Sequence, residues 1–509
     1  EKTGIIDTIV FQLEDFIKKP SEIHKKIKAY NDNISSLGTL VIMLSSHPVE
    51  IDYFVVHSND AKIPKARKNA FANFFFSMKA FFATFTTDYS SVGMTTNDPN
   101  AERIEVWLTV GKDQTNILRK LIDEQFSPSH GIQVDLKLVS GAALLPATLA
   151  GKGPDVALGV GSNVPVNYAL RNAVVDLSSF DDYGQIEGRF HESAIVPFSF
   201  NDGVFALPEQ QMFLMMFYRK DIFEEYGLKV PNTWDELISS VIDLQKYNLE
   251  FYLPVPMTEG AAVNLPPNPI FSTMFYQNDG QFYINGDTES GFASGKGPEI
   301  FETWTRFYTD YSFPVQADFA NRFRSGQMPI GIAYYNTYNT LSVFAPEIRG
   351  KWEFLPVPGT VVTDELGNPV LDESGNPVIR RETVSTGTGS IILKSSKKQE
   401  AAWKFLKWWT STETQVRFGR EMEGILGAAA RYPTANVEAM KSLPWRVNEL
   451  TVLQEQWSWV KGIPEVPGSY MTGRHVDNAL RKVINDNDNP RETIYDYVQV
   501  INEEIRKKR

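Results

Sequence analysis

The chain has 509 residues, of which 42% are apolar and 22% charged, as is typical of a folded protein with several domains. Its net charge of −12 provides no basic surface of the kind that binds nucleic acid. The absence of cysteine excludes disulfides, thiolate metal sites and a cysteine nucleophile. No apolar run approaches the ~20 residues of a membrane span.

Residues 1–100 are expected to form a mixed or mainly helical accessory module. Ser21–Tyr30 has helical periodicity, whereas Thr39–Leu44 and Ile51–Val56 are short apolar runs that fit strands. The next segment, from Phe71 to Tyr89, is interpreted as a helix packed on a core. A membrane-surface helix is disfavoured because few cationic residues accompany its apolar face. The polar segment Thr95–Ala101 marks the expected domain boundary. The helical segment places seven apolar residues on one face: Phe71, Phe74, Phe75, Met78, Phe82, Phe85 and Tyr89.

Strands and helices alternate after this boundary. Arg103–Thr109, Val134–Val139 and Asp155–Leu158 have strand-like patterns. The helical patterns Gln114–Phe126 and Ala142–Leu149 separate them. This order predicts a parallel sheet with crossover helices.

Later segments carry recognisable start and turn signals. Thr233 followed by Glu236 has the spacing of a capping box. Asn489 before a proline predicts the start of the last helix. The repeated GNPV segments at Gly367–Val370 and Gly375–Val378 predict an exposed β-ribbon, because two copies are too few for a solenoid.

Five motifs in a fixed order add a resemblance to a known family. In this order they resemble the extracellular solute-binding proteins of carbohydrate ABC importers, over roughly Arg103 to Arg509. The resemblance implies an α/β fold of two lobes joined by crossing hinge strands. The motifs are GKGPDVA (Gly151–Ala157), DGVFALP (Asp202–Pro208), NTWDEL (Asn232–Leu237), FRSGQM (Phe323–Met328) and EAAWKFLKWW (Glu400–Trp409).

The same resemblance predicts how the chain is divided. Residues 101–212 with about 320–385 are expected to form the first lobe. Residues 213–319 with about 386–509 are expected to form the second lobe, and residues 1–100 the accessory module. Some large Gram-positive members carry an extra N-terminal region, so this module is interpreted as the end of a longer upstream region.

The ligand of such a fold lies between the lobes, at the carboxyl ends of the strands. Among Glu209, Gln210 and Gln211, at least one side chain is expected to face it. Asp113 follows the first strand and can instead cap the next helix. Loops with polar and aromatic side chains provide the other candidates. The predicted ligand-binding residues are Trp107, Asp113, Gln114, Ser162, Asn163, Glu209, Gln211, Glu259, Asn268, Tyr334, Tyr335, Asn336, Thr388, Glu423, Arg431 and Trp457.

The chemistry of these side chains favours an oligosaccharide. Neutral polar groups and aromatic rings dominate, whereas an anion site would need converging arginines or lysines; an acidic sugar remains an alternative. The resemblance implies no cofactor or metal, an ABC permease as partner, and a cell-surface location through a lipid anchor that this chain lacks. Glu1 without a preceding signal peptide predicts a mature or trimmed form.

Two other classes of function remain open. Glu209, Glu259 and Glu423 could form a carboxylate pair for glycoside hydrolysis, although any chain with 62 acidic residues contains such sets. No G-x-S-x-G, H-E-x-x-H or P-loop sequence is present. A cell-surface glycan-binding protein without a transport role is the second alternative.

Overall fold

The computed structural model describes residues 4–45, 70–83, 101–253 and 267–508. The chain divides into two compact units, residues 1–92 and 93–509. Among the helices in these described ranges, none is both long enough and apolar enough to cross a membrane.

The first unit is helical in its described part. Helices α1 (Gly4–Lys18) and α2 (Ile23–Ser45) pack against each other, and Lys26 Nζ lies 2.6 Å from a carboxylate oxygen of Asp15. Thr39–Leu44 belongs to α2, so the predicted strand there is wrong. A short apolar run has no periodicity that separates a strand from a buried helical turn.

Helix α3 (Ala70–Ala83) confirms the helical stripe that follows. Phe74, Phe75, Phe76 and Phe81 are exposed, however, so Phe74 and Phe75 do not pack in a core as the sequence favoured. Three other predicted features lie outside the described residues: Ile51–Val56, Phe85 and Tyr89.

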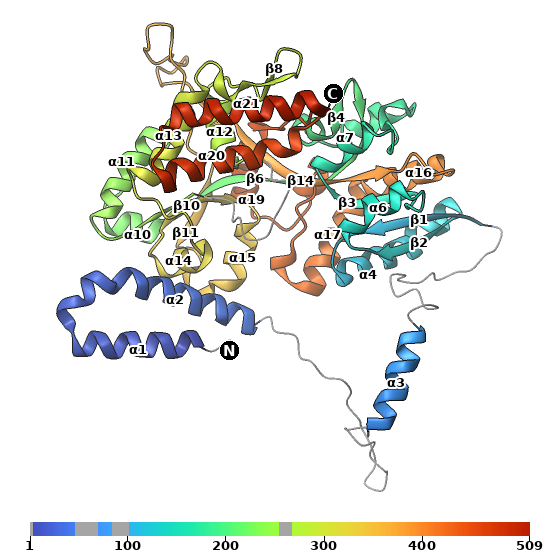
Figure 1. The fold of residues 1–509 in the computed structure, drawn as a ribbon, viewed down its shortest axis with the longest axis horizontal. Coiled ribbons are helices and arrows are strands. Elements are labelled where there is room, and N and C mark those ends of the chain that lie inside the picture. Colours follow the sequence, from blue (N-terminus) through green and yellow to red (C-terminus); the bar gives the residue numbers. More distant parts are fainter. Residues whose placement is uncertain (1–3, 46–69, 84–100, 254–266, 509) are drawn as a thin grey trace. The chain divides into compact units, whose positions relative to one another are not determined.

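A nine-stranded mixed sheet runs through the second unit (Figure 1). The strand order is β2-β1-β3-β14-β6-β10-β7, with β11 paired to β6 and β15 to β14. Strands β1 (Glu102–Leu108), β2 (Ile132–Leu138) and β3 (Val156–Gly161) are parallel, as the alternation of strands and helices predicted.

The other half of the sheet is built around β6 (Leu207–Arg219), a strand of 13 residues. Its first half pairs antiparallel with β14 (Thr383–Ile392), which also pairs with β3. Its second half pairs with β10 (Ile330–Tyr334) and β11 (Trp352–Leu355). Two short strands of the same sheet are β7 (Phe251–Tyr252) and β15 (Val460–Lys461). Separate pairs are formed by β4 (Ser199–Phe200) with β5 (Gly203–Val204) and by β8 (Tyr283–Ile284) with β9 (Glu289–Ser290).

Helices cover both parts of this sheet. Those associated with β1–β3 are α4 (Lys112–Leu121), α5 (Ser127–His130), α6 (Leu144–Leu149), α7 (Asn163–Ala169), α8 (Tyr183–Glu187), α9 (Glu192–Ile195), α16 (Gln399–Trp409) and α17 (Thr412–Leu426). Those associated with the other part are α10 (Lys220–Glu225), α11 (Trp234–Gln245), α12 (Pro269–Gln277), α13 (Gly297–Thr309), α14 (Phe319–Ser325), α15 (Thr337–Phe344), α18 (Val437–Lys441), α19 (Val447–Ser458), α20 (Thr472–Asp486) and α21 (Pro490–Lys508).

Separate hydrophobic cores define two lobes. The first core joins strands β1–β3 to α16 and α17, with Val106 and Phe405 among its buried side chains. The second lobe has one core on each face of the β6–β10 sheet: Leu214 lies in the core with α12, α13, α20 and α21, and Phe213 in the core with α14, α15 and α19. The predicted two-lobed α/β fold is confirmed.

The packing corrects how two segments were divided between the lobes. Residues 319–354 share their core with β6 and β10 of the second lobe, where the sequence had placed about 320–385 in the first. Residues 392–435 share their core with β1–β3 of the first lobe, where the sequence had placed them in the second. The cause is the pairing of β14 with β3, which returns the chain to the first lobe.

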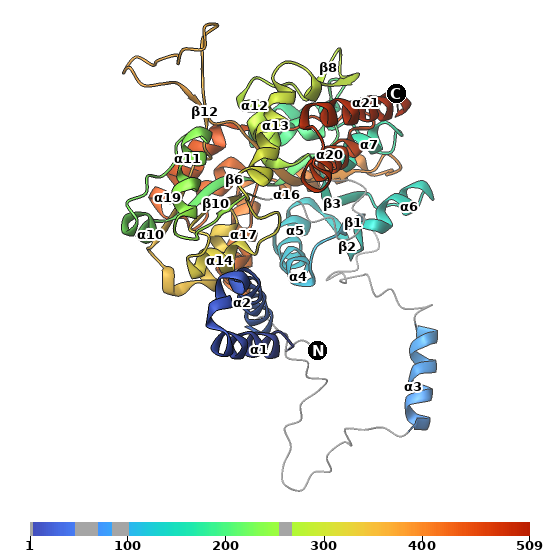
Figure 2. The same cartoon turned by 60° about the vertical axis from the view of Figure 1, so that its left-hand side comes forward.

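A β-ribbon projects from the second lobe, as Figure 2 shows beside the label β12. It joins β12 (Thr360–Val361) to β13 (Ile379–Arg380), and two copies of one turn lie between them. In each copy an aspartate accepts a hydrogen bond from the backbone N–H four residues on, Asp364 at 2.8 Å and Asp372 at 2.9 Å. The GNPV repeats therefore form the predicted exposed ribbon.

A buried carboxyl group links the stability of the second lobe to pH. Glu465 precedes α20, and the Ser469 hydroxyl donates to it, but burial still raises its pKa from 4.5 to about 7. Because ionisation costs more in the folded chain than in the unfolded chain, this group lowers stability as pH rises from about 4.5 through 7.

We therefore expect Glu465→Gln to be more stable than the wild type at pH 8, by about 1–3 kcal/mol, with the difference disappearing near pH 5. Urea unfolding at both pH values measures this difference. Glu365→Gln, at an exposed ribbon position, is the control and should show little dependence on pH. An equal effect of Glu465→Gln at pH 5 and pH 8 would contradict the expectation.

Candidate ligand-binding site

Three chain segments run side by side where the two lobes meet. Strands β6 and β14 pair here, with Gln210 opposite Thr388. The segment that follows α17 joins them, since the Gln211 backbone N–H donates to the Pro433 carbonyl at 3.0 Å and the Ala435 N–H to the Glu209 carbonyl at 2.9 Å. These crossing segments are the candidate hinge, and ligand-binding residues are sought around them.

Alternation along β6 decides which of its three polar residues turns outward. The side chains of Glu209 and Gln211 point the same way and are 4% and 2% exposed, whereas Gln210 is half-buried. Glu209 and Gln211 are therefore buried supports of the hinge, and Gln210 is the most exposed of the three side chains. On β14, Thr386 and Thr388 are half-buried, and Thr388 Oγ1 has no hydrogen-bond partner among the described residues.

Strands β1 and β3 bring the first-lobe candidates to one edge. Because these strands are parallel neighbours, their carboxyl ends meet, and the loops after them lie together. Trp107 near the end of β1 is half-buried, with its Nε1–H donating to a Glu105 carboxylate oxygen at 2.6 Å. Ser162 and Asn163 follow β3 and are half-buried at the start of α7.

Asp113 and Gln114 lie in the first turn of α4, which follows β1. Asp113 is exposed and Gln114 half-buried. The residue at the cap position is Gly111, so the capping role considered for Asp113 is not observed. Both side chains remain predicted ligand contacts.

The two tyrosines at the end of β10 face opposite ways. Tyr335 is 2% exposed, its ring packs 4.9 Å from that of Phe213, and its hydroxyl donates to the Gln211 carbonyl at 3.1 Å. It is therefore a core residue instead of the predicted stacking surface. Tyr334 is half-buried, and burial raises its pKa to about 12; Asn336 beside it is also half-buried.

Trp457 is part of the interior of the hinge. Its indole N–H donates to Gln211 Oε1 at 2.8 Å, and the Gln211 amide donates to the hydroxyls of Ser193 and Ser385, each at 3.0 Å. This burial contradicts the predicted ligand-stacking role of Trp457. Gln211 thus connects β6 to α9 of the first lobe, to β14 and to α19.

Arg431 on the third crossing segment forms an ion pair with Glu423 of α17. Two guanidinium nitrogens lie 2.8 and 2.9 Å from the carboxylate oxygens, and the guanidinium lies 4.5 Å from the centre of the Trp445 ring. Arg431 is buried, so its charge is balanced within the protein.

One of the last two candidates is on the second lobe. Asn268 is buried and caps α12, where its side-chain oxygen accepts from the Ile270 N–H at 2.8 Å, so its predicted ligand contact is corrected to a structural role. Glu259 lies outside the described residues.

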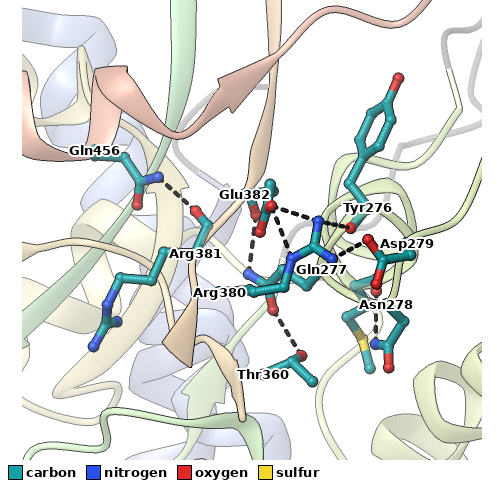
Figure 3. A network of polar contacts seen from close by, with 10 residues as sticks. Tyr276, Gln277, Asn278, Asp279, Thr360, Arg380, Arg381, Glu382 and Gln456 are labelled. Atoms are coloured by element: carbon teal, nitrogen blue, oxygen red, sulfur yellow. Dashed lines mark hydrogen bonds and ion pairs between the residues drawn. The ribbon is translucent and has the colours of Figure 1, made fainter. Parts of the chain in front are cut away.

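A polar network fixes the point at which β14 leaves the second lobe (Figure 3). Glu382 accepts from the Arg380 guanidinium at 2.7 Å, and that guanidinium also pairs with Asp279. Gln277 at the end of α12 donates to the Glu382 carbonyl at 2.9 Å. The contacts tie one end of the crossing strand to α12 and to the base of the ribbon.

One cavity of about 690 Å³ is lined mainly by α15, β11 and α19 of the second lobe, with Tyr338, Trp352 and Asn448 among its residues. Ala428, from the segment that follows α17, also lines it. None of the predicted ligand-binding residues is in this lining.

Two lobes on one sheet, joined by three crossing segments, define an α/β ligand-binding protein of the hinged type. The bacterial extracellular solute-binding protein family matches residues 111–416, and the chain belongs to this family. A protein of Brucella abortus (strain 2308) that is named as a binding protein is 21% identical over 311 residues, which cover 58% of this chain and 68% of that protein.

Solved structures show the same fold. The sugar-binding protein MalE from Xanthomonas citri has a TM-score of 0.64 at 18% identity and covers 80% of this chain and 98% of its own. The cyclic alpha-maltosyl-1,6-maltose binding protein from Arthrobacter globiformis has a TM-score of 0.62 at 16% identity, covering 80% and 100%. A solute-binding protein from Thermotoga lettingae, bound with alpha-D-tagatose, has a TM-score of 0.59 at 17% identity, covering 80% and 100%.

Proposed function

We propose that this protein binds an oligosaccharide between its two lobes and delivers it to the permease of an ABC importer at the cell surface. The observation that carries the proposal is the crossing of β6 and β14 between two separate cores, in a chain of the extracellular solute-binding family. Similar structures that bind sugars support the ligand class. A lipid anchor would hold it at the membrane.

The groups around the crossing suit a neutral sugar. Gln210, Thr386 and Thr388 offer neutral donors and acceptors, and Trp107 and Tyr334 offer partly exposed rings. Arg431, on the third crossing segment, is already paired with a carboxylate. A neutral ligand can satisfy such groups, whereas an acidic ligand would require an unpaired cation.

Hinge closure is the proposed mechanism. Ligand contacts made by both lobes exist only in the closed arrangement, so binding shifts the population towards it. The three crossing segments permit this movement because they are few and adjacent, while each lobe keeps its own core. The closed surface would then be recognised by the permease, and no bond in the sugar is broken.

A thermal-shift panel of oligosaccharides, amino acids, peptides and anions tests the ligand class. A ligand at one hundred times its Kd stabilises the folded protein by about 2.7 kcal/mol. We expect a shift with one class of sugar and no consumption of that sugar on long incubation. Consumption would indicate a glycan hydrolase, and a shift only with amino acids, peptides or anions would overturn the sugar proposal.

Tyr334→Ala is expected to weaken sugar binding about tenfold or more while lowering the ligand-free Tm by only a few degrees. Its half-buried ring ends β10 beside the crossing, so it can contact a ligand without supporting the centre of the core. Calorimetric titration and thermal unfolding measure the two effects. Tyr247→Ala, at an exposed position after α11, is the control and should leave binding unchanged. Unchanged binding in Tyr334→Ala would remove this residue from the site.

A further inference from the structure

Glu209 has a buried carboxylate whose bonded partners are neutral donors. Only 4% of the residue is exposed. The Gly159 backbone N–H lies 3.2 and 3.1 Å from its two oxygens, and the Ser390 hydroxyl also donates to it. Burying a carboxylate is costly unless donors compensate, and burial raises the pKa of Glu209 despite these hydrogen bonds. The cost indicates that the arrangement serves a purpose beyond filling space.

Gly159 links this contact to the loops that follow β1 and β3. Gly159 adopts a φ of +69°, and its carbonyl accepts from the Thr109 hydroxyl at 3.2 Å. Thr109 is the first residue after β1, and Gly159 lies two residues before the end of β3. Glu209 therefore contacts the N–H of Gly159 and Thr109 contacts its carbonyl, two successive peptide groups at the edge where the loops after β1 and β3 meet.

The same residue is anchored in the hinge. In β14, Thr388 is opposite Gln210 and Gly389 is opposite Pro208, so Glu209 occupies a bulge without a direct partner. Ser390 of β14 reaches its carboxylate, and the third crossing segment donates a backbone hydrogen bond to its carbonyl. Glu209 is thus attached to all three crossing segments as well as to β3.

We infer that Glu209 is a positioning residue: its buried carboxylate couples the crossing strands to the loops after β1 and β3, which include Ser162 and Asn163. Movement of the hinge is then transmitted to these loops through the two peptide groups that flank Gly159. The inference rests on the proposed function in one respect: the loops that Glu209 positions are proposed to contact the ligand. The coupling itself is a property of the protein without ligand.

Amide hydrogen exchange of the ligand-free protein tests the coupling. In Glu209→Ala we expect exchange about tenfold or more faster in residues 157–164, with a smaller increase in residues 108–114 and no change in α13. Glu209→Gln should restore most of the protection, because its amide oxygen can accept from Gly159 and its NH₂ can donate to Ser390. Asp477→Ala removes a carboxylate that is equally buried in the second lobe and is the matched control.

Three results would overturn the inference: unchanged exchange in residues 157–164, an equal increase in α13, or the same local increase in Asp477→Ala. If Glu209→Ala does not fold, Ser390→Ala keeps the carboxylate but removes its anchor on β14, and the same local increase is expected. No change in Ser390→Ala would then contradict the coupling.

Calorimetric titration with maltose separates this inference from the proposed function. If the wild type binds maltose, Glu209→Ala should weaken binding about tenfold, Glu209→Gln much less, and Asp477→Ala hardly at all. Equal weakening in Glu209→Ala and Asp477→Ala would count against the inference. If no sugar binds the wild type, the proposed function fails, and the exchange experiment still decides the coupling.

Discussion

Gln211→Leu is expected to lower the free energy of unfolding by about 2–4 kcal/mol. The substitution removes the acceptor of the buried Trp457 N–H and the donors to the hydroxyls of Ser193 and Ser385. Each buried polar group left without a partner costs about 1–3 kcal/mol. Because these partners come from both lobes and from β14, no single neighbour can move to compensate.

Urea unfolding at equilibrium measures this loss, and Gln245→Leu provides the matched control. Gln245 makes one exposed hydrogen bond, to the Tyr311 carbonyl, so its replacement should cost at most about 0.5 kcal/mol. Similar losses in the two variants would show that the network around Gln211 adds nothing beyond an ordinary surface contact.

Gln211 and Glu209 together explain how a hinge can be both movable and well defined. Both side chains lie on the inner face of β6, one bonded towards α9 and α19 and the other towards β3. Polar contacts are directional, so they fix the register of the crossing strands in a way that apolar packing does not. Gln210 between them is half-buried and pairs with Thr434 of the third crossing segment.

Local sequence patterns were sufficient for much of the fold. The alternation of strands and helices gave the parallel arrangement of β1–β3, and the cap signals gave the starts of α11 and α21. The GNPV repeats gave the ribbon because Asp364 and Asp372 close their turns within a few residues. Each of these features depends on contacts that are close in sequence.

Features set by distant contacts could not be obtained in this way. The pairing of β14 with β3 places residues 392–435 in the first lobe, and no local signal in that segment identifies its partner. The inward direction of Glu209 likewise depends on the bulge in β6, and that of Tyr335 and Trp457 on their hydrogen bonds to Gln211. A polar or aromatic residue after a predicted strand is equally compatible with a ligand contact and with a buried support.

The alternation of β6 was the one signal that could have separated these roles. Residues two apart on a strand share a face, so Glu209 and Gln211 must point together and Gln210 away from them. Choosing the outward face still required the buried partners of Gln211, which lie 18 residues before it and 174 and 246 residues after it. The sequence restricts the choice to two arrangements, and the long-range contacts select one.

Arg431→Met is expected to destabilise the protein by about 2–4 kcal/mol, and the double variant Arg431→Met/Glu423→Gln by only about 1 kcal/mol. The single change leaves the largely buried carboxylate of Glu423 without its cation, whereas the double change removes both charges. Methionine keeps an unbranched chain against the Trp445 ring, so the comparison isolates the charge. Urea unfolding of the wild type, both single variants and the double variant gives the coupling energy.

Additive losses would show that the two residues contribute independently. Retention of sugar binding in the double variant would assign the pair to the support of the third crossing segment, and loss of binding at preserved stability would assign it to the ligand site.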